Sequence, residues 1–189
     1  MKLATDRRVK YTRMVLRESL IELLQEKPIS RLTIKELCQR ADINRATFYS
    51  HYHDQYDLLK TIETSFIADI NSHLDRFALE ADEASMVEIL TAIFEHLAEN
   101  RELCQVLLGN NTDLDFQANI MKAAGQRVLL EWRKNKGVNE AAEYMYTYVA
   151  TGAIGVIRRW LQEEKPQTPR QVAEFVTRLV YKGIEAFFA

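Results

Sequence analysis

The stretch TIKELCQRADINRATFYSHYHDQYDLL, residues 33–59, decides the fold. It begins with the pattern of a capping box, in which the Thr33 hydroxyl accepts a hydrogen bond from the backbone N–H of Glu36 and the Glu36 carboxylate reaches back. Apolar residues repeat at helical spacing over residues 34–41, and Asn44 is suited to cap a second helix. Two short helices joined by a brief turn predict a helix-turn-helix.

The second of these helices, expected over about residues 45–51, carries the side chains that face away from the protein core. Phe48 faces inward and locks the helix in place, whereas Ala46 allows a close approach to a DNA groove. Hydroxyl and ring groups on the outer face can contact bases or phosphates. The outward-facing residues that we predict to contact DNA are Arg45, Ala46, Thr47, Tyr49 and His51.

Two histidines in this stretch raise the alternatives of a metal site or an enzyme. His51 and His53 are two residues apart, so on a helix their side chains do not converge, and no third ligand is evident. The chain has no Gly-rich phosphate loop, no nucleophile elbow and no HExxH motif. We predict no catalytic residues, no metal and no cofactor, and a helical enzyme or carrier is kept as the outside alternative.

The composition favours a helical globular protein. The 189 residues are 47% hydrophobic and 28% charged, with only six glycines and three prolines. No apolar run is long enough to span a bilayer, and the N-terminus lacks the apolar core of a signal peptide. Cys38 and Cys104 have no metal-ligand or redox spacing, so we expect buried free thiols in the reducing cytoplasm.

Charge is distributed unevenly along the chain. Residues 1–60 hold 12 Lys and Arg against 8 Asp and Glu, whereas residues 61–189 hold 13 against 19. A basic head on an acidic body suggests that the head meets a polyanion. The cluster of basic residues near the N-terminus is either a solvated helix face or a contact with the phosphate backbone or a minor groove. Its members are Arg7, Arg8, Lys10 and Arg13, of which Lys10 is included in the predicted DNA site.

The rest of the chain reads as further helices, about nine in all, with no convincing strand. Asp54 starts a long helix with one apolar face, suited to act as a lever between two parts of the protein. Capping boxes at Ser85 and Thr168 begin two later helices. The expected helices are residues 5–25, 34–41, 45–51, 54 to about 77, 85–100, 101–108, 113–134, 139–164 and 169–188. The predicted fold class is all-α.

With these motifs in place, the chain resembles the TetR (tetracycline repressor) family of transcriptional regulators. The resemblance rests on residues 33–59 and covers about residues 7–60, while TGAIGVIRRWL and TPRQVAEFV resemble the last two helices of one branch. It implies a DNA-binding domain over residues 1–53 and a ligand-binding and dimerisation domain over residues 54–189. It also adds Thr33, Asn44 and Gln55 to the predicted DNA contacts. Gln55 stands at or next to a lysine of the family pattern, so its phosphate contact is a neutral hydrogen bond.

The last two expected helices are too apolar for a single buried stripe, which predicts that a second copy covers them. The alternative is that both helices are internal core. The predicted dimer interface consists of Tyr148, Gly152, Gly155, Val156, Trp160, Val172, Phe175, Val176, Leu179 and Ile184. A two-fold dimer places two recognition helices about 34–36 Å apart on a near-palindromic double-stranded operator.

The family plan further implies a ligand between the middle helices that moves the lever helix and releases DNA. The acidic body favours a small apolar or cationic inducer over an anion. The candidate ligand-binding residues are Phe66, Phe94, Leu97, Cys104, Leu107, Phe116 and Tyr148. The predicted function is a homodimeric repressor released by a small molecule. The alternative is the same head regulated by a partner protein or by nothing.

Overall fold

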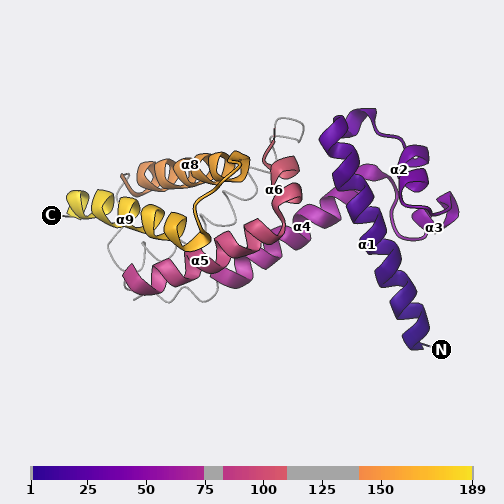
Figure 1. Cartoon of the computed structure of the whole chain (residues 1–189), viewed down its shortest axis with the longest axis horizontal. Helices are drawn as coiled ribbons and strands as arrows, with labels where there is room; N and C mark the ends of the chain where they lie inside the picture. The colour runs from indigo at the N-terminus through magenta and orange to yellow at the C-terminus, as the bar shows by residue number, and fades with distance from the viewer. Residues whose placement is uncertain (1, 75–82, 110–140, 189) are drawn as a thin grey trace.

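The computed structural model describes residues 2–74, 83–109 and 141–188, and within these ranges the chain is helical and contains no strand (Figure 1). The predicted all-α fold class is confirmed. The described elements are α1 (Lys2–Glu26), the 3-10 helix η1 (Ile29–Arg31), α2 (Ile34–Arg40), α3 (Arg45–Tyr49), α4 (Gln55–Leu74), α5 (Glu83–Glu99), α6 (Arg101–Leu107), α8 (Ala141–Gln162) and α9 (Pro169–Phe188). The helix expected over residues 113–134 lies outside the described ranges.

Helices α1 to α3 form a small head around one apolar centre. Leu16 and Leu20 of α1, Leu37 of α2 and Phe48 of α3 are almost completely buried. Helices of seven and five residues, such as α2 and α3, are too short to be stable alone in water. Their stability therefore comes from this shared core and from the polar contacts at their ends.

Helix α4 runs from the head into the body (Figure 1). Its buried face carries Leu58, Leu59, Ile62 and Phe66, which continue the apolar core away from the head. A second connection joins α1 to the corner between α5 and α6, where the Arg17 Nη2 atom donates to the Asn100 Oδ1 atom at 3.1 Å. The head thus meets the body through α4 and through α1.

In the body, the most extensive helix pairing is between α5 and α9. The rings of Phe94 on α5 and Trp160 on α8 meet edge to face with centroids 5.3 Å apart, so all three helices share one core. The Trp160 indole N–H donates to the Gln167 carbonyl at 2.7 Å. This bond satisfies the one polar group that the buried indole carries.

Helix α6 holds the end of α8. The Arg101 side chain donates to the Glu163 carbonyl and the Gln105 amide donates to the Leu161 carbonyl, both at 2.7 Å. Carbonyls at a helix C-terminus have no partner within the helix, so these bonds satisfy groups that would otherwise need water. They fix the turn from which α9 begins.

Several predicted helix boundaries are confirmed, but α1 begins at Lys2 rather than Thr5, α3 ends at Tyr49 rather than His51, and the predicted start of α5 is wrong. At α9, the Thr168 N–H donates to the Gln171 side chain at 2.9 Å and the Gln171 N–H donates to the Thr168 hydroxyl at 3.3 Å, as the capping box predicts. Helix α5 instead begins at Glu83, so Ser85 lies inside the helix rather than at its cap. Glu83 and Ala84 are good helix formers, and an acidic first turn suits the helix dipole.

Both cysteines are free and buried, as expected. Burial raises the pKa of the Cys104 thiol to about 12, which keeps it neutral in the core. Among the helices described, none combines the length and the apolar composition that crossing a membrane requires.

Candidate nucleic-acid interface

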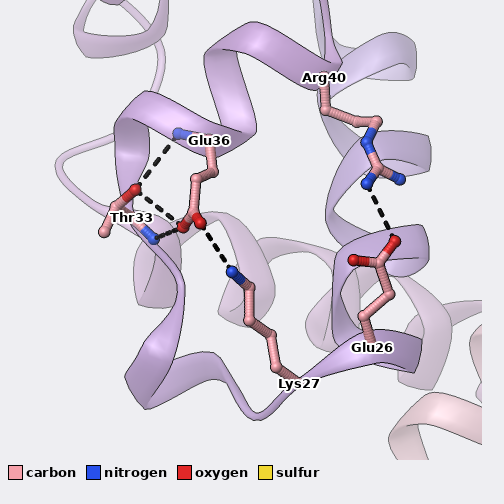
Figure 2. Close-up of polar contacts among 5 residues, drawn as sticks. All are labelled: Glu26, Lys27, Thr33, Glu36 and Arg40. Carbon is pink, nitrogen blue, oxygen red and sulfur yellow. Dashed lines mark hydrogen bonds and ion pairs between the residues drawn. The ribbon is translucent and has the colours of Figure 1, made fainter.

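The predicted capping box at the start of α2 is present (Figure 2). The Thr33 hydroxyl accepts from the Glu36 N–H at 3.3 Å, and the Glu36 carboxylate accepts from the Thr33 N–H at 3.0 Å and from the Thr33 hydroxyl at 2.9 Å. These bonds satisfy backbone donors at the N-terminus of a short helix. They also fix Thr33, an exposed residue of the predicted DNA site, at the start of α2.

Both ends of α2 are joined to the end of α1. The Lys27 ammonium donates to Glu36 at 2.7 Å, and Arg40 bridges Glu22 and Glu26 at 3.0 and 2.9 Å; Figure 2 shows the contact with Glu26. The Lys27 hydrogen bond, followed by those from Thr33, lowers the pKa of Glu36 from 4.5 to about 2. The carboxylates of Glu26 and Glu22 likewise raise the pKa of Arg40. Three ion pairs thus orient α2 on α1.

The turn between α2 and α3 contains a residue in the left-handed region of backbone space. Asp42 has a φ of 51°, a conformation that a short polar side chain tolerates better than a branched one. The next N–H, that of Ile43, donates back to the Cys38 carbonyl at 3.0 Å. This bond closes the end of α2 and sends the chain into α3.

Helix α3 is capped at its start and locked from within. The Asn44 side-chain oxygen accepts from the Thr47 N–H at 2.7 Å, as the sequence predicts. The Phe48 side chain is completely buried, and its ring meets that of Tyr49 edge to face at 5.5 Å. With Phe48 fixed in the core, the opposite face of α3 must point outward.

That outward face carries the residues predicted to contact DNA. Arg45 and Ala46 are exposed and Tyr49 is 57% exposed, while Thr47 and His51 are partly exposed. Because the cap occupies the Asn44 oxygen, its amide nitrogen is the group left to offer DNA. Among the predicted contacts outside α3, Lys10 on α1 is exposed and Gln55 at the start of α4 is partly exposed.

Two aspartates fix the step from α3 to α4. The Asp57 N–H donates to Asp54 at 2.8 Å, and the His53 N–H donates to Asp57 at 3.0 Å. Tyr56, beside Gln55 in the first turn of α4, is 48% exposed and was not among the predicted contacts. In the sequence, Tyr56 lies outside the apolar repeat of α4, and this position already indicates that its side chain faces outward.

Comparisons with known proteins agree on what this arrangement is. The family described as "Transcriptional regulator C-terminal region" matches residues 85–182, just over half of the chain, and "Bacterial regulatory proteins, tetR family" matches residues 16–62. The chain belongs to the tetR family. The family resemblance drawn from residues 33–59 is confirmed.

One curated relative and many solved structures are similar to this tetR-family chain. The "Uncharacterized HTH-type transcriptional regulator YxbF" of Bacillus subtilis (strain 168) is 34% identical over 95 residues, which cover 47% of this chain but only 25% of that protein. The chain thus spans about a quarter of the length of the curated relative that it matches.

Two structures illustrate the shared fold. A TetR transcriptional regulator from Streptococcus agalactiae 2603V has a TM-score of 0.68 at 20% identity and covers 95% of this chain and 99% of its own. The transcriptional regulator FadR from Bacillus subtilis, in complex with stearoyl-CoA, has a TM-score of 0.65 at 15% identity and covers 88% and 96%. At these identities the likeness shows the fold alone.

A second surface of interest lies between α8 and α9 of this tetR-family chain. It is an apolar groove with a volume of about 720 Å³. Large apolar side chains around it are exposed, with Tyr144 at 79%, Tyr148 at 76% and Leu179 at 54%. The lining residues, here called the α8–α9 groove, are Tyr144, Met145, Tyr148, Val149, Gly152, Ala153, Val156, Val176, Leu179, Val180 and Gly183.

The predicted dimer residues divide into two groups. Trp160, Val172 and Val176 have less than a tenth of their surface exposed, although Val176 also lines the α8–α9 groove. Their place in a dimer interface stays a prediction. They face the core because α9 packs along α5 and Trp160 meets Phe94. The predicted residues that are exposed or partly exposed are Tyr148, Gly152, Gly155, Val156, Phe175 and Leu179. The side chain of Ile184 lies outside the described residues.

The predicted ligand residues lie in two different places. Five of them are packed in the apolar core and none of the five lines the α8–α9 groove: Phe66, Phe94, Leu97, Cys104 and Leu107. They are apolar residues on the inner faces of α4, α5 and α6, and their role in ligand binding stays a prediction. Tyr148 does line the groove, and Phe116 lies outside the described residues.

Proposed function

We propose that the chain is a homodimeric, DNA-binding repressor that a small molecule releases from its operator. The observation that carries the proposal is the division of α3 into two faces. Phe48 is held in the core, and Arg45, Ala46 and Tyr49 are presented to solvent on a helix whose ends are fixed by side-chain contacts. A rigid, outward-facing helix with small, basic and aromatic residues suits the major groove.

The side chains have distinct roles in this proposal. Arg45 donates two hydrogen bonds to a guanine edge, and Tyr49 meets a thymine methyl group or a phosphate. Thr33, Gln55 and Lys10 contact the backbone and set the register of the head without reading sequence. The head over residues 1–53 binds DNA, and the body over residues 54–189 senses ligand and dimerises. No residue has a catalytic role.

A second copy of the chain is the proposed cover of the α8–α9 groove. One pair of helices exposes four large apolar residues, Tyr144, Tyr148, Phe175 and Leu179. Exposing this much apolar surface to water on neighbouring helices is unfavourable. Helices α8 and α9 of two copies then form a four-helix interface. Such a two-fold dimer presents two α3 helices about 34–36 Å apart, which suits a near-palindromic operator.

Release of DNA requires the body to move the head. Helix α4 is the part of the body that packs against both α1 in the head and α5, so a tilt of α4 changes the separation of the two α3 helices. FadR, which shares the fold, was solved in complex with stearoyl-CoA, and we propose a small apolar or cationic inducer for this chain. The inducer must bind the conformation that does not fit DNA more tightly, by the full size of its regulatory effect.

Two alanine variants test the assignment of α3. On a duplex enriched by the protein from a random-sequence pool, Arg45→Ala and Tyr49→Ala each weaken specific binding by about 1–3 kcal/mol. Arg170→Ala in the body, which also removes an exposed arginine, leaves the affinity unchanged. The measurement is a titration followed by fluorescence anisotropy, with thermal unfolding to check the fold. Wild-type affinity in both α3 variants contradicts the proposal.

A further inference from the structure

The N-terminal half of α1 extends beyond the rest of the head. Within the described residues, the buried face of α1 begins at Thr12 and continues through Leu16 and Leu20. Figure 1 shows the earlier turns projecting past α2 and α3, with no other described helix beside them. At about 1.5 Å per residue, Arg7 lies roughly 7 Å beyond Thr12 along the helix axis. A projecting helix of this kind is unexplained by the packing of the head.

Its arginines lack the carboxylate partners that some arginines elsewhere in the chain have. Arg7, Arg8 and Arg13 are exposed, and none of the carboxylates in the described ranges forms an ion pair with them. By contrast, Arg40 bridges two glutamates of α1. In the body, Arg159 pairs with Glu163. The charges of Arg7 and Arg8 on the projecting half of α1 are therefore not paired with a carboxylate in the described part of this chain.

The charge of Arg13, the last of these arginines, acts on a residue that follows α3. Burial raises the pKa of the Tyr52 hydroxyl, and the Arg13 guanidinium opposes that rise through its charge. Tyr52 follows α3 by three residues, and its N–H donates to the Phe48 carbonyl at 3.0 Å. The charge of Arg13 therefore acts at Tyr52, just beyond α3, and Arg7 and Arg8 precede Arg13 on the same helix.

We infer that the N-terminal half of α1 is a second DNA-binding element, in which Arg7 and Arg8 bind phosphates flanking the bases that α3 contacts. The inference rests on the proposed DNA-binding function and extends its Lys10 contact toward the N-terminus of α1. Guanidinium groups bind phosphate oxygens through paired, charge-assisted hydrogen bonds. Neighbouring helix positions point about 100° apart, so the two arginines reach different phosphates. Such contacts strengthen binding to any sequence without selecting one.

The salt dependence of DNA binding tests this element. The probe is a fluorescent mixed-sequence duplex, titrated with purified full-length protein over a series of salt concentrations. Each phosphate neutralised contributes about 0.9 to the slope of log K against log salt. The double variant Arg7→Ala/Arg8→Ala therefore loses about 1.8 from the slope per bound chain. The matched variant Arg159→Ala/Arg170→Ala removes two exposed arginines from the body and keeps the wild-type slope.

A lysine variant separates charge from structure. Arg7→Lys/Arg8→Lys keeps both charges and retains a slope close to that of the wild type, whereas the alanine pair does not. Equal slopes in the wild type and the alanine pair overturn the inference but leave the proposed function intact. An equal loss in the body variant also overturns it, because the effect is then one of net charge. A wild type that fails to bind the duplex even at low salt overturns both.

Discussion

The head and the α8–α9 groove use the same kinds of residues in opposite ways. In the head, the large apolar residue Phe48 is completely buried and the polar side chains around it face outward. At the groove, Tyr148 and Leu179 are mostly exposed although both are large and apolar. The head is thus complete as a folded unit that offers polar chemistry, while the groove offers apolar surface that favours a protein partner.

The two surfaces also differ in the interactions that hold their helices in place. In the head, α2 and α3 are short, and their orientation depends on two capped ends, three ion pairs and one buried ring. Helices α8 and α9 are 22 and 20 residues long, and their positions come from packing against α5 and α6. Single substitutions in the head should therefore alter the stability of the fold, and single substitutions at the α8–α9 groove should alter the assembly of the dimer.

The largest expected effect is a difference in stability between variants at two neighbouring positions of α3. Phe48→Ala removes a fully buried ring and lowers the free energy of unfolding by about 3–5 kcal/mol, since the cavity only partly closes. Tyr49→Ala, one residue along and 57% exposed, changes it by less than about 1 kcal/mol. Urea denaturation followed by circular dichroism measures both. Similar losses in the two variants would show that α3 does not have one inner and one outer face.

A charge placed in the α8–α9 groove tests assembly without disturbing the fold. Leu179→Lys puts two lysines in a two-fold interface, and a desolvation cost of about 3 kcal/mol raises the dimer dissociation constant roughly 100-fold. Ala98→Lys adds the same charge at an exposed position on α5 and leaves assembly unchanged. Sedimentation velocity over a concentration series measures the dissociation constant. Dimers of wild-type strength in Leu179→Lys would place the interface elsewhere.

The smallest effect concerns the ion pair that joins α2 to α1. The pKa of Glu36 is lowered from 4.5 to about 2, so its ionised form stabilises the folded head above pH 4.5 and this contribution is lost as the pH falls toward 2. Glu36→Gln removes the contribution. The wild type should exceed the variant in unfolding free energy by a constant amount above pH 4.5, and the gap should close below it. A gap that does not change with pH would contradict the assignment.

The sequence predicted the head well because its signals are local. Thr33 and Asn44 cap helices through residues three positions away, so the pattern and the contact lie in the same short stretch. Thr168 does the same for α9 in the body. The inward position of Phe48 follows from the period of one short helix. These contacts can be predicted without knowing which other helices lie nearby.

The body was predicted less well because its apolar faces have several possible partners. Val172, Val176 and Leu179 all belong to one apolar helix, but the first two are buried and the third is exposed. The face of α9 that meets α5 is decided by tertiary packing, and helical periodicity alone cannot predict it. Helical periodicity likewise could not predict that the Phe94 ring meets the Trp160 ring edge to face.

Selection of DNA from a random-sequence pool by the purified wild-type protein tests the central claim most directly. If two α3 helices read DNA from a two-fold dimer, the enriched sequences contain inverted half-sites whose centres lie about 10–10.5 base pairs apart, or a multiple of that spacing. Their binding weakens steeply as salt is raised. Enrichment of an unrepeated site would contradict the dimer, and no enrichment over the starting pool would contradict DNA recognition by α3.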